Sequence, residues 1–105
     1  MRISFSSNKT EKILTNERLI DRRYNKEHAK RIKSRLTELR SAKNLNEIPQ
    51  TPPPRRHKLN GEYKNCWGVD YSRNFRIVLE PIGNFDINDL STITEVKIIA
   101  LEDYH

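Results

Sequence analysis

The sequence holds only one cysteine, Cys66, and three glycines in 105 residues. A single thiol forms no internal disulfide and cannot supply a cysteine-based zinc site. Three glycines are too few for a glycine-rich loop that cradles phosphate. No apolar run approaches the roughly 18 residues of a membrane-spanning helix, and nothing resembles a signal peptide. These absences favour a cytoplasmic protein that does not contact a membrane.

Hydrophobic residues make up 34% of the chain, which is enough for one domain, residues 1–105, around a small core. The net charge of +6 is unevenly distributed. Residues 1–60 hold 16 Lys and Arg against 6 Asp and Glu, whereas residues 61–105 hold 4 against 8, so the halves carry +10 and −4. This asymmetry favours a polyanionic partner, with RNA or DNA first, and solvated basic helices that bind nothing are the alternative.

The spacing of apolar residues predicts a strand followed by two helices in the first half. Residues 1–6 alternate apolar and polar side chains, as a half-buried strand does, and residues 9–20 favour a short amphipathic helix. Residues 25–44 predict a longer helix with Asn25 as its N-cap. Its apolar stripe consists of Ala29, Ile32, Leu36, Leu39 and Ala42. The opposite face either meets phosphate or is simply solvated, and it carries Lys26, Lys30, Arg31, Lys33, Arg35 and Arg40.

The second half of the chain changes to strand patterns. Three consecutive prolines at 52–54 favour a stiff, extended connector. Residues 57–71 show strand alternation, and residues 65–71 with 74–81 predict a hairpin closed by a tight turn. Residues 83–92 are polar and indicate a loop before a last strand over 94–105. Segregated helices and consecutive strands predict an α+β fold with a largely antiparallel sheet.

Few residues are of a type that carries chemistry, and three of them are histidines. His28 lies on the polar side of the predicted long helix, where we expect it to be exposed and without a role. No two histidines have metal-ligand spacing, which argues against a metal site. Cys66 beside Trp67 indicates a packed thiol rather than a nucleophile. The remaining basic and aromatic set comprises His57, Lys58, Arg73, Arg76, Tyr104 and His105.

Such a set suits cleavage of RNA without a metal or a cofactor. The ribose 2′-hydroxyl supplies the nucleophile, so the protein needs a base, an acid for the 5′-oxygen and cations for the phosphorane charge. Histidine titrates near neutral pH, and arginine can hold two phosphate oxygens at once. Each residue also has a structural alternative. Arg76 could pair with an acid such as Glu80. Arg73 could be plain surface, Tyr104 could only pack, and His105 could be a solvated tail.

Four short motifs occur in order along the chain and together resemble a known family. They are His57-Lys-Leu-Asn-Gly61, Trp67-Gly-Val69, Asn74-Phe-Arg-Ile77 and the terminal Asp103-Tyr-His105. Their order and spacing resemble the HigB branch of the RelE/ParE toxin superfamily. Because the strand–helix–helix–strands order agrees as well, the resemblance covers essentially the whole chain.

The resemblance implies a compact α+β fold in which two N-terminal helices pack on a small, curved antiparallel sheet. It also implies a toxin of a type II toxin–antitoxin system, which cuts mRNA in the ribosomal A site without a metal ion. Its partners would be the ribosome, mRNA and a cognate antitoxin of the HigA type with a helix-turn-helix domain. Operator DNA would be reached only through that antitoxin.

Carried over residue by residue, the resemblance assigns proton transfer to His105 and stabilisation of phosphate charge to Arg76. The full set of catalytic candidates is His105, Arg76, Tyr104, Asp103 and His57. The expected RNA-binding residues are the cations Lys58, Lys64, Arg73, Arg55 and Arg56. One departure is Asn60, which stands where some relatives have a lysine, so that Lys58 or Lys64 would have to substitute.

Three other functions remain open. A relative of ParE would poison DNA gyrase, although that activity needs no terminal proton-transfer set. A non-catalytic RNA-binding protein would lose binding and phenotype in parallel when Arg76 or His105 is substituted. A co-repressor that acts only within the toxin–antitoxin complex, having lost its activity, would be consistent with Asn60.

Overall fold

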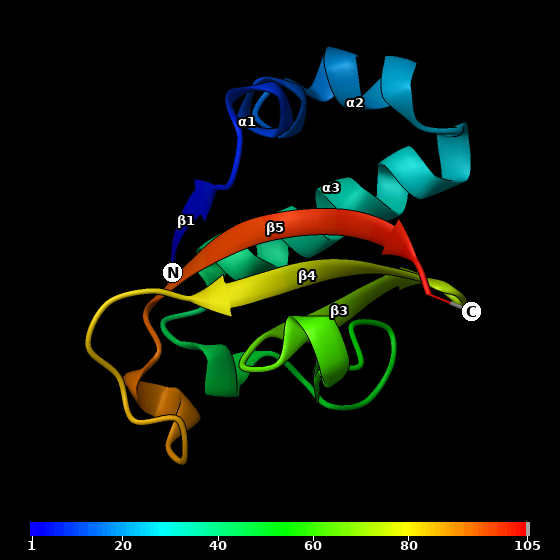
Figure 1. Cartoon of the computed structure of the whole chain (residues 1–105). Helices are drawn as coiled ribbons and strands as arrows, with labels where there is room; N and C mark the ends of the chain where they lie inside the picture. The colour runs from blue at the N-terminus through cyan, green and yellow to red at the C-terminus, as the bar shows by residue number, and fades with distance from the viewer. Residues whose placement is uncertain (105) are drawn as a thin grey trace.

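The computed structural model describes residues 1–104, which form one five-stranded sheet with three α-helices on one of its faces (Figure 1). The helices are α1 (Asn8–Leu14), α2 (Glu17–Arg23) and α3 (Lys26–Ser41). The strands are β1 (Arg2–Phe5), β2 (His57–Lys58), β3 (Trp67–Ser72), β4 (Phe75–Pro81) and β5 (Glu95–Asp103). Short 3-10 helices lie between these elements, namely η1 (Leu45–Glu47), η2 (Gly61–Tyr63) and η3 (Leu90–Thr92).

The sheet has the order β1-β5-β4-β3-β2. Strand β1 runs parallel to β5, whereas β5 with β4, β4 with β3 and β3 with β2 are antiparallel. The prediction of an α+β fold with a largely antiparallel sheet is therefore confirmed. The hairpin of β3 and β4 also lies where the alternation placed it, with its turn at residues 73–74.

The N-terminal helical region differs from the prediction of one helix over residues 9–20. Ser7 caps α1, and a C-cap at Thr15 ends this helix. Asn16 then caps α2, because its side-chain oxygen accepts hydrogen bonds from two backbone amides of the next turn. A strong capping residue inside a helical pattern competes for backbone amides and starts a new helix. Residues 1–104 therefore contain three α-helices, where the family resemblance implied two helices.

Helix α3 begins where the prediction placed its cap. The Asn25 side chain accepts a hydrogen bond from the His28 amide at 2.7 Å. All five residues of the predicted apolar stripe are buried. Arg35 departs from the prediction of a basic outer face, because it is buried and turned toward the sheet. Its Nη1 lies 3.3 Å from the carbonyl oxygen of Asp70.

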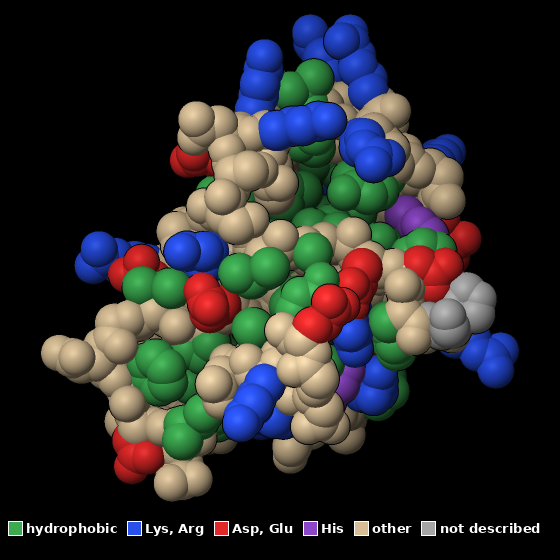
Figure 2. All heavy atoms as spheres, in the orientation of Figure 1, with side chains coloured by type: hydrophobic (Ala, Val, Ile, Leu, Met, Phe, Trp, Pro, Cys, Tyr) green, Lys and Arg blue, Asp and Glu red, His purple; other side chains and the backbone are tan. Residues whose placement is uncertain are grey.

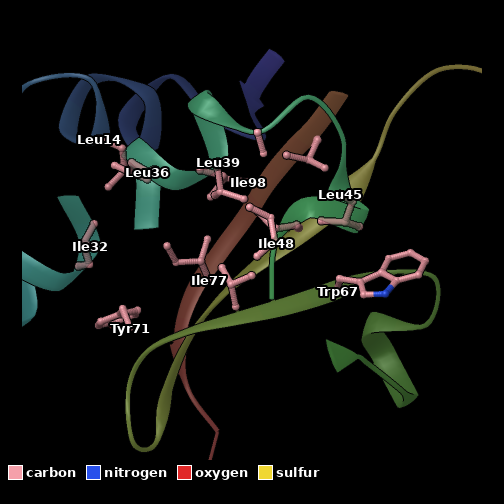
Figure 3. Packing of buried hydrophobic residues seen from close by; sticks show 14 of the residues in the cluster. Leu14, Ile32, Leu36, Leu39, Leu45, Ile48, Trp67, Tyr71, Ile77 and Ile98 are labelled. Carbon is pink, nitrogen blue, oxygen red and sulfur yellow. The ribbon is translucent and has the colours of Figure 1, made fainter. Parts of the chain in front are cut away.

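The main core lies between the helices and the sheet (Figure 3). Leu36 of α3 belongs to this cluster together with Ile77 and Ile98 of the sheet, and all three are at most 1% exposed. Side chains alternate along a strand, so the burial of Val69 on the helix side turns its neighbour Asp70 to the opposite face. The core thus leaves one face of the sheet free of α-helices, here called the helix-free face, and that face can display polar residues.

A smaller apolar cluster covers part of the helix-free face and contains Leu59, Cys66 and Val78. Burial raises the pKa of the Cys66 thiol, because the interior disfavours the thiolate. The prediction of a packed cysteine is therefore confirmed. Within residues 1–104, no helix is both long enough and apolar enough to cross a membrane.

The proline segment does more than connect the two halves of the chain. Pro54 is buried, and its carbonyl oxygen accepts a hydrogen bond from the Asp70 amide at 2.7 Å. The peptide bond between Pro52 and Pro53 is cis. The segment therefore docks against β3 and brings the following residue, Arg55, beside Asp70.

Candidate active site

A polar cluster occupies the helix-free face of the sheet near the end of β5. The register places Asp70 of β3 opposite Arg76 of β4, and Arg76 opposite Glu102 of β5. Side chains of directly paired residues point to the same face, so these three strands present one continuous row of charges. His57 of β2 pairs with Gly68 and joins this row from the edge of the sheet.

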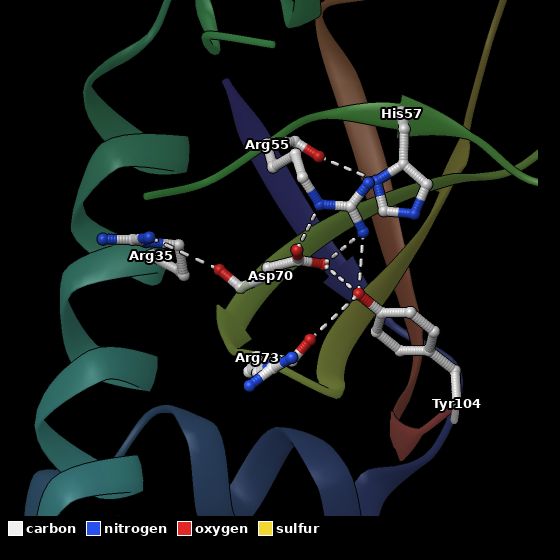
Figure 4. Close-up of polar contacts among 6 residues, drawn as sticks. All are labelled: Arg35, Arg55, His57, Asp70, Arg73 and Tyr104. Carbon is white, nitrogen blue, oxygen red and sulfur yellow. Dashed lines mark hydrogen bonds and ion pairs between the residues drawn. The ribbon is translucent and has the colours of Figure 1, made fainter. Parts of the chain in front are cut away.

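Arg55, Asp70 and Tyr104 form the centre of the cluster (Figure 4). The Nε of Arg55 donates to the Asp70 carboxylate at 2.6 Å, and its Nη2 donates to the Tyr104 hydroxyl at 2.7 Å. That hydroxyl lies 3.1 Å from the Asp70 carboxylate, to which it donates in turn. The three side chains therefore fix one another, and Tyr104 is held against β3.

Arg55 has an uncommon backbone conformation. Its φ is +45°, in the left-handed region that residues with side chains rarely adopt. Such strain persists only where surrounding contacts hold it, and it is concentrated at functional sites. The hydrogen bonds of the Arg55 side chain to Asp70 and Tyr104 hold the backbone in this conformation. Its hydrogen bond to Asp70 also raises the pKa of Arg55, so the guanidinium stays charged.

Arg76 lies beside this centre and is held by an acid and two aromatic rings. Its Nε and Nη2 lie 2.7 Å and 2.5 Å from one oxygen of Glu102. The guanidinium carbon is 4.5 Å from the ring centroid of Tyr104 and 5.8 Å from that of Tyr63. Pairing with Glu80, the alternative drawn from the sequence, does not occur. Glu80 lies four residues along the same strand, about 13 Å away, whereas Glu102 lies directly across.

His57 completes the cluster from β2. Its Nδ1 lies 2.7 Å from the carbonyl oxygen of Arg55. A carbonyl oxygen only accepts, so we assign the proton of the uncharged ring to Nδ1, which leaves a lone pair on Nε2. The ring centroid lies 6.3 Å from that of Tyr104. Gly68 makes room for this ring, because a Cβ at position 68 would lie 3.1 Å from the imidazole.

The structure therefore brings together Arg55, His57, Arg76 and Tyr104 from the sites expected on sequence grounds. Arg73 lies exposed in the hairpin turn, and its carbonyl oxygen is 3.4 Å from the Tyr104 hydroxyl. Asp103 ends β5 opposite Phe75 of β4.

The expected catalytic residue His105 lies outside the described residues. Its assignment continues to rest on the terminal Asp-Tyr-His motif.

Three of the expected RNA-binding cations stand apart from the cluster. Arg56 is buried and donates from Nε to the Ile48 carbonyl oxygen at 2.8 Å, and desolvation lowers its pKa. It therefore serves the fold, contrary to the prediction that it binds RNA. Lys58 is exposed on β2, with its ammonium 5.0 Å from the ring centroid of Trp67. Lys64 is exposed just after η2.

His28 has a packing role, contrary to the prediction that it is exposed and without function. It is half-buried on α3, and its ring meets that of Tyr71 edge-on at a centroid distance of 5.3 Å. Its centroid lies 4.6 Å from that of Phe75. The histidine thus ties α3 to the hairpin that carries Asp70 and Arg76.

Sequence reasoning missed Asp70 and Glu102. An acid in the middle of a strand whose side chains are otherwise buried is unusual, and this signal could have identified Asp70. Glu102 has no local signal, because its contact with Arg76 depends on the register of β4 against β5. That register includes an irregularity beside Val78.

A surface groove of about 710 Å³ adjoins the cluster, between α3, the proline segment and the β3–β4 hairpin. Its lining includes one acid, Asp70, and the four arginines Arg31, Arg35, Arg55 and Arg73. Three of these arginines are already paired with an acid, namely Arg31 with Glu27, Arg35 with Glu38 and Arg55 with Asp70, so the groove holds little net positive charge. Within residues 1–104, no group of three or more His, Cys, Asp or Glu side chains is placed to hold a metal ion.

No family model matches the sequence, and no curated protein matches it. Solved structures do match in fold. The YoeB/ParE toxin from Agrobacterium tumefaciens aligns with a TM-score of 0.59 at 11% identity, over 100% of both chains. The YoeB-YefM complex from Staphylococcus aureus aligns with a TM-score of 0.57 at 15% identity, over 100% of this chain and 97% of that one. The chain has the YoeB/ParE toxin fold.

A heterotetrameric complex of the YoeB-YefM toxin-antitoxin from Staphylococcus aureus gives a similar result, with a TM-score of 0.56 at 14% identity. The TM-scores establish the YoeB/ParE fold. The sequence identities are too low to transfer an activity. The activity therefore has to be argued from the cluster around Arg55 and Arg76.

Proposed function

We propose that the chain is the toxin of a type II toxin–antitoxin system, of the HigB branch, and that it cleaves mRNA in the ribosomal A site. One observation carries the proposal: Arg55, His57, Arg76 and Tyr104 gather on the helix-free face of a YoeB/ParE-type sheet. Two of these residues, His57 and Arg76, stand in the motifs that resemble the HigB branch, and Tyr104 stands in the terminal motif.

Metal-independent cleavage of RNA needs two proton transfers. The 2′-oxygen attacks phosphorus while the bond from phosphorus to the 5′-oxygen breaks, which leaves a 2′,3′-cyclic phosphate and a 5′-hydroxyl. One group takes the proton of the 2′-hydroxyl, and another gives a proton to the departing 5′-oxygen. We assign these transfers to His57 and His105. His57 offers Nε2, because its Nδ1 is engaged by the Arg55 carbonyl oxygen.

The phosphorane carries extra negative charge, which we assign to the two arginines. Arg76 uses two nitrogens on Glu102 and keeps other N–H donors for phosphate oxygens. Fixed donors aimed at developing charge are usually the largest contribution to this kind of catalysis. Tyr104 holds Arg55 through its hydroxyl and contacts Arg76 through its ring, so it links both cations.

The proposed partners follow from the charge of the chain. Exposed cations on α3, such as Lys26 and Lys30, would bind phosphates of ribosomal RNA, so association with ribosomes should weaken steeply with salt. A cognate antitoxin of the HigA type would bind the free toxin and bring it to operator DNA. The YoeB-YefM structures are complexes of this general kind.

Message integrity in a purified translation reaction tests the proposal. We expect the wild type to cut mRNA only when ribosomes are present, and His105→Ala and Arg76→Ala to lose the cuts. Arg2→Ala is the matched control, because Arg2 is exposed and pairs with Glu95 at the opposite end of β5 from Tyr104. Intact message in every reaction would overturn the proposal, and cleavage complexes of DNA gyrase would then favour the ParE activity.

A further inference from the structure

The loop that carries η2 lies over the helix-free face of the sheet (Figure 1). A hydrogen bond from the Leu59 amide to the Cys66 carbonyl oxygen, at 3.0 Å, closes this loop at its base. Two of its residues, Gly61 and Asn65, have φ angles of +67° and +72°, in the left-handed region. Glycine enters this region freely, and asparagine is one of the few other residues that visit it. The loop between β2 and β3 is therefore a defined turn that folds back onto the sheet.

Tyr63 is the aromatic residue of η2, and the loop fixes its backbone. Its amide donates to the Asn60 carbonyl oxygen at 3.3 Å, and its carbonyl oxygen accepts from the Cys66 amide at 2.9 Å. The side chain packs against the small apolar cluster of Leu59, Cys66 and Val78. The tyrosine is only half-buried, so part of its ring remains available to a neighbour outside that cluster.

That neighbour is the guanidinium of Arg76. Its central carbon lies 5.8 Å from the ring centroid of Tyr63 and 4.5 Å from that of Tyr104. A cation within about 6 Å of an aromatic centroid is attracted by the ring. The two rings have separate anchors, because the Tyr104 hydroxyl bonds to Asp70 on β3 whereas Tyr63 rests on the apolar cluster. Arg76 is therefore restrained from two independent parts of the fold.

The acid that pairs with Arg76 fixes the position of the guanidinium but not its plane. Both contacts from Arg76 go to the same Glu102 oxygen, Oε1. Pairing through both carboxylate oxygens would fix the plane, whereas pairing to one oxygen lets the guanidinium pivot. The rings of Tyr63 and Tyr104 are placed to restrict that pivot. Figure 2 shows acidic and basic side chains side by side on this part of the surface.

The hydroxyl of Tyr63 reaches the acid of the same pair. Burial raises the pKa of Tyr63, and its hydrogen bond with Glu102 raises that pKa further. A protonated phenol donates to a carboxylate, so the hydroxyl helps to hold Glu102 in place. One tyrosine therefore contacts both members of the ion pair, the cation with its ring and the acid with its hydroxyl.

We propose that Tyr63 is a positioning residue for Arg76. Its ring sets the plane of the guanidinium and its hydroxyl fixes Glu102, so that the remaining N–H groups of Arg76 face the scissile phosphate. This inference rests on the proposed function, which assigns the phosphorane charge to Arg76, and it adds a residue outside the four motifs of the family resemblance. Donors that are already oriented need not move as charge develops, so loss of Tyr63 should lower kcat and leave KM nearly unchanged.

The NMR signal of the Arg76 Nε–H group tests the geometry without any substrate. This signal is identified by its absence from the spectrum of Arg76→Lys. We expect Tyr63→Leu to shift it, because the ring current of Tyr63 is lost, and to speed its exchange with water. Tyr24→Leu is the matched control and should do neither, because Tyr24 is also half-buried and lies 5.3 Å from an arginine, Arg23, but stands outside the cluster. An Arg76 signal that is unchanged in Tyr63→Leu would overturn the proposal.

Ribosome-dependent cleavage of mRNA then tests the consequence for the reaction. We expect Tyr63→Leu to lower kcat about tenfold, and Tyr63→Phe, which keeps the ring but lacks the hydroxyl, to lower it about threefold. KM should stay nearly constant in both, and Tyr24→Leu should match the wild type. Melting temperatures show which variants fold, and Tyr63→Phe preserves the packing, so it decides the question where Tyr63→Leu does not fold.

Two kinetic results would contradict the positioning role. One is an equal loss of kcat in Tyr63→Leu and Tyr24→Leu, and the other is a change confined to KM. A wild type that leaves the message intact overturns the proposed function instead, and the Arg76 signal then decides alone whether Tyr63 holds Arg76. Failure of the nuclease and failure of the positioning role are therefore distinguishable.

Discussion

Replacing Asp70 with asparagine tests whether one shared carboxylate holds the candidate active site together. Asp70 is 8% exposed, and its carboxylate accepts from both Arg55 and Tyr104. Asparagine has nearly the same size, so Asp70→Asn keeps the packing and removes the charge. Arg55 is then left at a φ of +45° without the ion pair that holds it there.

The expected loss of stability is moderate. The Arg55 side chain is 40% exposed, so solvent screens its ion pair, which contributes about 1 kcal/mol. The hydrogen bond from Tyr104 to the charged acceptor contributes about another 1 kcal/mol. The free energy of unfolding should therefore fall by about 2 kcal/mol in Asp70→Asn. In a chain of this size, that change lowers the melting temperature by roughly 8 °C or more.

The loss of activity should exceed the loss of stability. Arg55 and Tyr104 would no longer be fixed, and misplacement of positioning groups by about 1 Å can cost roughly a hundredfold in rate. Thermal melting and ribosome-dependent message cleavage, measured where both proteins are folded, check the two effects. Asp21→Asn is the matched control, because it makes the same chemical change in an exposed ion pair with Lys33. An Asp70→Asn protein that melts and cleaves like the wild type would refute the reasoning.

Three other substitutions test His57, Tyr71 and Arg76 in turn. Gly68→Ala places a Cβ 3.1 Å from the His57 imidazole and should lower the rate of cleavage. In a protein that already carries His57→Ala, the same substitution should lower that rate no further. Burial raises the pKa of Tyr71 to about 12, so the unfolded chain loses this proton first and unfolding becomes easier as the pH rises from 10 to 12. Denaturant titrations of Tyr71→Phe should lack that part of the alkaline loss, and identical pH profiles would contradict the assignment. Arg76→Lys keeps the charge but loses the paired contact with Glu102, and it should lower cleavage roughly a hundredfold, whereas wild-type rates would leave Arg76 without a catalytic role.

Local sequence patterns predicted those elements whose signal is contained within the element itself. The cap at Asn25 and the stripe that includes Leu36 are such signals, and both are confirmed. A capping residue also explains why the helix predicted over residues 9–20 is divided into α1 and α2. Asn16 lies between two weakly amphipathic stretches, and the stabilisation from its cap outweighs continuation of a helix that buries little on either side.

Strand alternation predicted the direction of Arg76 but not its partner. Arg76 lies between Phe75 and Ile77, so its side chain points away from theirs, and Ile77 is fully buried on the helix side. The partner Glu102 is fixed by the pairing of β4 with β5, two strands that are separated by a long loop. An irregularity in that pairing shifts the register, and such a shift cannot be read from either strand alone.

Arg55 and Arg56 show most clearly what the sequence could not resolve. The two arginines are neighbours with the same side chain, and both were expected to bind RNA. Arg55 instead contacts Asp70 on the helix-free face, while Arg56 is buried and donates to a main-chain carbonyl oxygen. Their separation accompanies the left-handed φ of Arg55, which the contacts of Arg55 with Asp70 and Tyr104 hold. Those contacts are tertiary, so they cannot be predicted from residue type and spacing.

The pairing of both site arginines bears on why the proposed nuclease would depend on the ribosome. Arg55 is balanced by Asp70 and Arg76 by Glu102, so these four side chains sum to zero charge. A phosphate that approaches from solution meets little long-range attraction at the site and must compete with two carboxylates for N–H donors. An mRNA held in the ribosome has already lost its freedom of movement, so the site only has to engage a phosphate placed against it. Under the proposed function, free mRNA should therefore be a poor substrate even at low salt, where electrostatic attraction is strongest.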